Sequence, residues 1–98
     1  MTRGTTPTNT FAVPIDLTSA EVIYITYDQN ERTVIEKNKS DMTVTENSIE
    51  VKLTQEETLR LREDRVEIQI SARFPDGTVV RSNIMKTTAE KVLKEEAI

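Results

Sequence analysis

Hydrophobic and polar residues alternate with a period of two along most of the chain, which is typical of antiparallel β-strands. The alternation is most regular over residues 66–74, where Val66, Ile68 and Ile70 alternate with charged or polar side chains. Residues 22–27 form the strongest predicted strand, because all of them are β-branched or aromatic. Shorter strands are expected at 11–15, 33–37, 42–45, 48–53 and 78–84.

A two-residue turn at 46–47 predicts how two of these strands pair. It would place Val44 opposite Ile49 and Met42 opposite Val51, with all four side chains on one face of a sheet. The alternate residues of the second strand are charged and would face solvent, so the pattern indicates a sheet with one wet side.

A second turn is predicted at 30–31, but the sequence leaves open the register of the two strands that it joins. A two-residue loop there would set Tyr27 opposite Val34, whereas a loop shifted by one residue would turn the other face inward. The pattern of the return strand alone does not choose between the two pairings.

The hairpin with the longest strand turns at residues 75–77, Pro-Asp-Gly, which suit a type I turn followed by a left-handed glycine. This three-residue loop would set Phe74 opposite Thr78 and Ile68 opposite Ile84. Large apolar residues then share one face, which a two-residue loop would not achieve.

Residues 54–57, Thr-Gln-Glu-Glu, have the form of a capping box, in which Thr54 and Glu57 would each bond the backbone of the other. A short helical turn through Leu61 is therefore expected. Residues 87–98 have the composition of a capped helix, but they could equally extend a strand, because a terminal helix of this length is marginal unless it docks.

Six or seven short strands with one helical turn predict an all-β fold, an antiparallel immunoglobulin-like β-sandwich. The alternative is an α+β fold in which a C-terminal helix packs on an open sheet. Residues 1–10 are rich in threonine and show no periodicity, so we expect a flexible arm there and a single sandwich domain over 11–98. Pro14 cannot donate to a ladder, which places the first strand at an edge.

Composition narrows the possible functions. The chain has 98 residues with neither cysteine nor histidine, so thiol nucleophiles, imidazole bases and the usual zinc ligand sets are excluded. Its net charge of −4, with both signs interspersed, argues against a nucleic-acid partner. No apolar run is long enough to enter a membrane, and no hydrophobic leader follows Met1, so synthesis in the cytoplasm is expected. We expect no catalytic residue, metal or cofactor.

The candidate interaction residues are Val22 and Tyr24. They lie on one face of the 22–27 strand, whose other face is also apolar and is expected to enter the core. An apolar face turned away from the core needs a cover, so the pair indicates a contact with another protein subunit, a second copy being one candidate. The alternative is that the segment around Val92 and Leu93 covers this face within the chain.

A carbohydrate- or cell-surface-binding module is the alternative function. Glycan sites commonly use exposed aromatic platforms, and this chain has no tryptophan. Its aromatic residues are Phe11, Tyr24, Tyr27 and Phe74, and the two tyrosines lie on opposite faces of their strand, so they cannot form one platform.

Nearly the whole chain resembles a group of small, poorly characterised proteins encoded by phages and prophages of Gram-positive bacteria. The resemblance implies a virion component, associated with the tail or baseplate, and supplies no catalytic residues. It rests on Arg3-Gly4-Thr5-Thr6-Pro7-Thr8 followed by Phe11 and Pro14-x-Asp16, on Ile25-Thr26-Tyr27-x-Gln29-Asn30, on Val51-x-Leu53-Thr54-Gln55-Glu56-x-Thr58-Leu59, on Ser82-Asn83-Ile84 and on Lys91-Val92-Leu93-Lys94.

Overall fold

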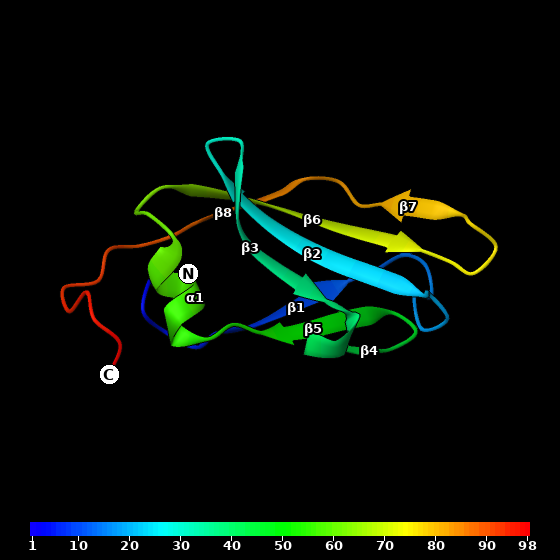
Figure 1. The fold of residues 1–98 in the computed structure, drawn as a ribbon, viewed down its shortest axis with the longest axis horizontal. Helices are drawn as coiled ribbons and strands as arrows, with labels where there is room; N and C mark the ends of the chain where they lie inside the picture. Colours follow the sequence, from blue (N-terminus) through cyan, green and yellow to red (C-terminus); the bar gives the residue numbers. More distant parts are fainter.

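The computed structural model describes residues 1–98 as two antiparallel β-sheets that face each other (Figure 1). Sheet 1 has the strand order β1-β5-β4, and sheet 2 has the order β3-β2-β6, with β7 and β8 both paired to β6. The all-β prediction is thereby confirmed. The elements are β1 (Thr8–Ala12), β2 (Val22–Gln29), β3 (Arg32–Asn38), the short 3-10 helix η1 (Lys39–Asp41), β4 (Met42–Val44), β5 (Ser48–Lys52), α1 (Gln55–Arg60), β6 (Arg65–Arg73), β7 (Val79–Arg81) and β8 (Met85–Thr88).

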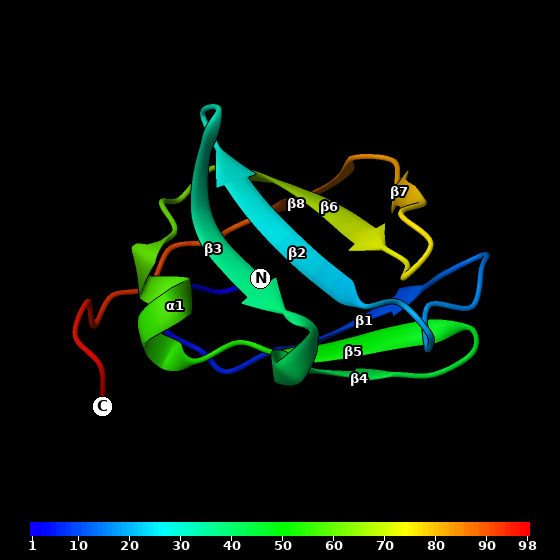
Figure 2. The same cartoon turned by 45° about the vertical axis from the view of Figure 1, so that its right-hand side comes forward.

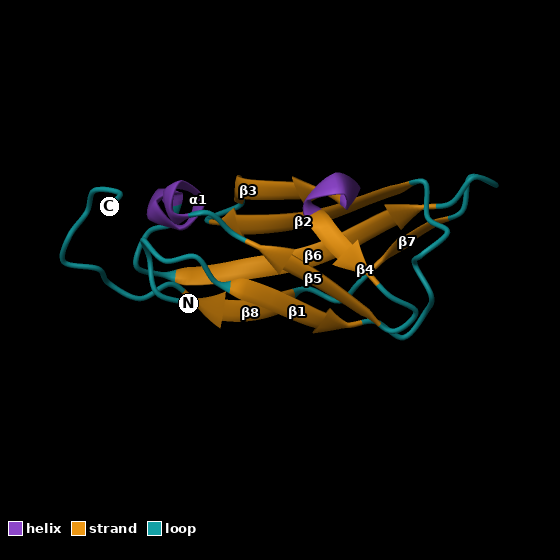
Figure 3. Ribbon diagram, turned by 90° about the horizontal axis from the view of Figure 1, so that it is seen from below, coloured by secondary structure: helices purple, strands orange, loops and turns teal.

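Three connections carry the chain between the sheets: the loop after β1, η1 after β3, and α1 after β5 (Figure 2). The hairpins β2–β3, β4–β5 and β6–β7 each stay within one sheet. Helix α1 and both chain termini lie at one end of the molecule, and β7 lies toward the other end (Figure 3).

The inner faces of the two sheets form one hydrophobic core. The alternation along β2 works as predicted, since Ile23, Ile25 and Tyr27 are fully buried. On sheet 1, Ile49 and Val51 of β5 alternate with exposed residues in the same way, and both belong to the same core. The other buried apolar residues are Leu17, Ala20, Ile35, Leu53, Leu61, Val66, Ile68, Ile70, Ala72 and Ala89.

Three of the sequence-predicted local features are confirmed. The turn at 46–47 pairs Val44 with Ile49. In the hairpin at 75–77 the Phe74 amide donates to the Thr78 carbonyl over 2.8 Å. Helix α1 starts at the expected capping box, in which Thr54 Oγ1 accepts from the Glu57 amide.

The far end of that long hairpin differs from the prediction, because Ile68 lies opposite Met85 rather than Ile84. The hydroxyl of Ser82 accepts a hydrogen bond from the Ile70 amide and thereby interrupts the ladder. The return chain is split into β7 and β8, and Ile84 is left 55% exposed at the break.

The open register at 30–31 is decided by a β-bulge. The turn itself has two residues, and Asn30 and Glu31 both adopt the positive φ angles, 50° and 64°, of a type I′ turn. A register shift after Tyr27 then places Ile35 opposite Tyr27, where the simple two-residue loop would have placed Val34. The bulge lets both Tyr27 and Ile35 point into the core.

The first strand is at a sheet edge as predicted, but it spans residues 8–12 rather than 11–15. Pairing with β5 ends at Val13, whose amide donates to the Asn47 carbonyl over 3.0 Å. The next residue, Pro14, has no amide hydrogen to continue the ladder.

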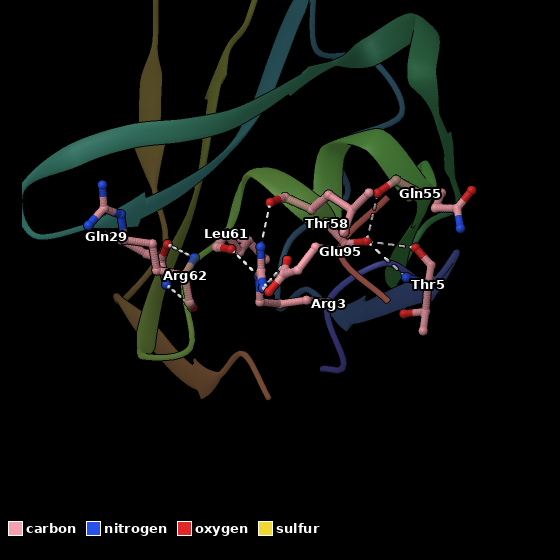
Figure 4. Close-up of polar contacts among 9 residues, drawn as sticks. Arg3, Thr5, Gln29, Gln55, Thr58, Leu61, Arg62 and Glu95 are labelled. Atoms are coloured by element: carbon pink, nitrogen blue, oxygen red, sulfur yellow. Dashed lines mark hydrogen bonds and ion pairs between the residues drawn. The ribbon is translucent and has the colours of Figure 1, made fainter. Parts of the chain in front are cut away.

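The segment 1–10, predicted to be a flexible arm, is part of the domain in the structure. The guanidinium of Arg3 donates to the carbonyls of Leu59 and Leu61 at the end of α1, and the Thr5 amide donates to Thr58 Oγ1 over 3.1 Å (Figure 4). The last carbonyl groups of a helix have no partner within the helix and need such donors. Residues 1–10 supply them within the same chain, so no neighbouring subunit is needed to order this segment.

The C-terminal helix of the alternative fold is absent. Residues 85–88 pair with β6 as β8, and no helix follows them. β-Branched Thr87 and Thr88 suit this strand, which gains tertiary contacts that a short isolated helix would lack.

One side-chain hydrogen bond joins the two sheets through the core. Tyr27 on β2 is fully buried, and its hydroxyl donates to Asn9 Oδ1 on β1 over 2.7 Å. Burial first, and then the carboxylate of Glu57, raise the pKa of Tyr27, which keeps the phenol protonated as a donor.

A nearly buried ion pair joins α1 to sheet 2. Lys37 Nζ on β3 lies 2.8 Å from Glu57 Oε1, and the side chains are only 10% and 14% exposed. Burial acts to raise the pKa of Glu57, but hydrogen bonds from Lys37 and Thr54 outweigh it and hold that pKa below the ordinary range.

We expect Tyr27→Phe to destabilise the domain by about 1–2 kcal/mol, because it removes the donor to the half-buried Asn9 amide oxygen. Urea unfolding followed by circular dichroism would measure this loss. The matched control is Tyr24→Phe, which removes the same hydroxyl from an exposed side chain and should change stability by less than about 0.5 kcal/mol. Equal effects of the two variants would show that the inter-sheet bond contributes nothing.

Glu57→Gln should lower the free energy of unfolding at neutral pH and make that free energy depend less on pH in the acid range. The pKa of Glu57 is lower in the folded chain than in the unfolded chain, where it is about 4.3. The stabilisation is therefore present above that value and is lost as the pH falls through the folded pKa. Urea midpoints measured from pH 7 downward should show the curves of the wild type and the Glu57→Gln variant converging in acid. Parallel curves would contradict this role for the ion pair.

Candidate functional site

The candidate site is the outer face of sheet 2, the side turned away from sheet 1. The sequence-predicted residues Val22 and Tyr24 both lie there on β2, and Tyr24 is 41% exposed. Their neighbours on the same strand, Ile23 and Ile25, point the opposite way and are fully buried. The structure thus separates the two apolar sides of this strand as the sequence predicted. We call the exposed side the outer face: Val22, Tyr24 and Thr26 of β2, Glu36 of β3, Ser71 and Arg73 of β6, and Val79 and Arg81 of β7.

These outer-face side chains surround a shallow hollow of about 330 Å³. A second hollow of about 320 Å³ continues along the same face and shares Thr26, Glu36, Ser71 and Arg81 with the first. The two hollows together form one open depression across four strands, with its apolar part around Val22 and Tyr24.

No segment of the chain covers this depression. Val92, which the sequence offered as a cover, lies near Gly4 at the α1 end of the molecule, 3.6 Å from where a Cβ on that glycine would stand. Its neighbour Leu93 is 88% exposed. The intramolecular cover is therefore excluded, and Val22 and Tyr24 stay accessible from solvent.

Opposite charges lie at the two margins of the outer face. Glu36 on β3 has no ion-pair or hydrogen-bond partner, although it lines the depression. On the other margin, Arg81 of β7 donates only to the neutral hydroxyl of Ser71, over 3.0 Å. Three strand spacings separate β3 from β7, roughly 14 Å between their backbones, and these two charges form no ion pair within one copy.

Arg73, also on this face, is loosely paired with Glu21 at 3.9 Å, and both side chains are about half exposed. Such a pair contributes little to stability and is easily exchanged for another partner.

The sequence analysis missed Glu36 and Arg81. The alternation in the longest predicted hairpin already turned Arg81 outward, whereas the face of Glu36 was left open with the register at 30–31. Only the bulge and the strand order place the two residues on opposite margins of the same face. The signal that could have found them is a charged residue on the wet side of a strand adjacent to an exposed apolar one.

The carboxylates with shifted pKa outside α1 lie in turns. A hydrogen bond from the Thr18 hydroxyl, and then one from its amide, lower the pKa of Asp16. The Thr78 amide similarly lowers the pKa of Asp76. Such bonds stabilise turn geometry. No group of three or more acidic, histidine or cysteine side chains lies together as a metal site would require. None of the helices is long and apolar enough to cross a membrane.

Comparisons of the chain with models of protein families, with curated proteins and with solved structures found no match.

Proposed function

We propose that this chain is a non-enzymatic protein-interaction module that associates with a second copy of itself through the outer face of sheet 2. The observation that carries the proposal is that exposed Tyr24 and half-buried Val22 line an uncovered depression. Exposed apolar side chains at a central strand, framed by charged residues, are typical of protein interfaces.

The charges on the outer face favour a second copy as the partner. In an isologous dimer, a two-fold rotation brings the outer face of one copy against the same face of the other copy. With the axis roughly along the strands, β3 of one copy faces β7 of the other, so the unpaired Glu36 of each copy approaches Arg81 of its partner. An axis across the strands would place β3 on β3, and therefore Glu36 against Glu36.

We further propose that the sandwich is immunoglobulin-like. The facing strand orders β1-β5-β4 and β3-β2-β6-β7 support this, because they correspond to the B-E-D and C′-C-F-G sheets of that fold. The helical crossover between β5 and β6 fits the same connection. The usual cysteine pair and core tryptophan are absent from the sequence, so the proposal rests on topology alone.

The resemblance to small phage and prophage proteins supports a role as a virion component of the tail or baseplate. The carbohydrate-binding alternative has less support, because Tyr27 is in the core and Tyr24 is the one aromatic residue among the exposed large hydrophobic side chains.

Tyr24→Arg should give a folded monomer, because it places a charge in the centre of the proposed contact while the exposed side chain is not needed by the core. Light scattering over a hundredfold concentration range would measure the molar mass. The matched control is Thr43→Arg, which adds the same charge on the exposed side of β4 in sheet 1 and should leave the dimer unchanged. A wild-type chain that is monomeric throughout would overturn self-association.

Exchanging the two margin charges tests the arrangement of the dimer. Glu36→Lys or Arg81→Glu alone should weaken association about tenfold, since each places like charges across the interface. The double variant restores opposite charges and should recover most of the wild-type affinity. Additive losses in the double variant, measured by analytical ultracentrifugation, would contradict the proposed two-fold axis.

A further inference from the structure

We infer that Arg32, Arg60 and Arg62 form a binding site for a phosphate dianion. They line a hollow of about 320 Å³ at the α1 end of sheet 2, together with Gln29, Asn30 and Val34. This site is distinct from the outer face and does not depend on the dimer proposed above.

Three separate elements bring these arginines together. Arg32 begins β3 directly after the type I′ turn, Arg60 ends α1, and Arg62 follows in the connection to β6. Arg60 and Arg62 are close in the sequence, whereas Arg32 is distant from both. Only the packing of α1 beside the β2–β3 hairpin places all three around one hollow.

The buried side chain of Gln29 fixes the backbone at this hollow. Gln29 Oε1 accepts from the Arg62 amide over 2.8 Å, and Nε2 donates to the Arg62 carbonyl over 2.9 Å (Figure 4). Both backbone groups of Arg62 are thereby held, while its guanidinium stays free. The backbone that carries the Arg62 side chain is therefore set by the fold before any ligand binds.

None of these guanidinium groups has an ion-pair or hydrogen-bond partner, in contrast to Arg3, which pairs with Glu95 at 2.8 Å. The residues that line the hollow include no carboxylate. Acidic residues lie close by in the chain, since Glu31 precedes Arg32 and Glu63 follows Arg62. Glu31 and Asp64 line a separate hollow, and Glu63 lines neither of the two. A chain of net charge −4 thus keeps three guanidinium groups without an ion-pair partner around one hollow.

The carbonyl groups at the C-terminal end of α1 would repel an anion, but the guanidinium of Arg3 is hydrogen-bonded there. Its guanidinium donates to the carbonyls of Leu59 and Leu61, which removes the exposed acceptors next to Arg60. These two carbonyl groups are therefore not free to repel an anion at the hollow.

The chemistry of the hollow selects a phosphate group. Guanidinium groups bind phosphate oxygens with paired, charge-assisted hydrogen bonds, and three such groups match a dianion better than a carboxylate. Gln29 has both amide ends engaged, and Val34 is the single apolar residue of the lining. No aromatic side chain is present to stack a nucleobase, so the ligand is recognised by its phosphate alone.

Titration of the isotope-labelled chain with inorganic phosphate, followed by amide NMR shifts at constant ionic strength and about pH 8, tests the site. We expect saturable shifts at Asn30, Arg32 and Arg62 with a dissociation constant of about 1 mM. Arg62→Gln should raise that constant about tenfold and keep the Gln29 clamp, which involves only backbone atoms of residue 62. Lys52→Gln, which removes the same charge from the exposed side of β5, is the control and should bind like the wild type.

Acetate and dimethyl phosphate, both monoanions, should bind at least several-fold more weakly than inorganic phosphate. Shifts that rise linearly without saturation, equal binding of the monoanions, or phosphate binding retained in the triple variant R32Q/R60Q/R62Q would overturn the proposal. Circular dichroism of each variant checks that the fold is intact. Because the light-scattering readout of the dimer is separate, failure of either proposal leaves the other standing.

Discussion

The rest of the structure depends on the burial of Tyr27 at the centre of sheet 2. A buried phenol needs a hydrogen-bond partner, and the partner here, Asn9, belongs to the other sheet. The same position requires the bulge that turns Ile35 inward beside the ring. One side chain therefore bonds across the two layers and packs beside the residue that the bulge turns inward.

Helix α1 is held from both sides, which explains why so short a helix is ordered. Lys37 pairs with Glu57 at its first turn, and Arg3 caps its last carbonyls. Thr58, fully buried, adds reciprocal hydrogen bonds with Thr5. The N-terminal segment thus stabilises the fold by contacts within its own chain.

Local sequence features predicted the fold where short-range chemistry decides it. The turn at 46–47, the capping box at Thr54 and the alternation along β6 each fix a few neighbouring residues, and the structure follows them. The prediction was wrong where a distant side chain intervened. Ser82 bonds the Ile70 amide and shifts the return strand, and the long-range contacts of Arg3 order a segment whose own composition indicates no structure.

The sequence by itself determined the class of structure, an all-β chain without histidine or cysteine chemistry, because period-two alternation and residue type are local properties. It also identified Val22 and Tyr24, since a strand that is apolar on both sides shows this in its own residues. Only the tertiary structure decided that nothing in the chain covers them, and that arginines from three elements share a hollow. Those facts depend on strand order and on where α1 docks, which are set by the packing of the whole chain.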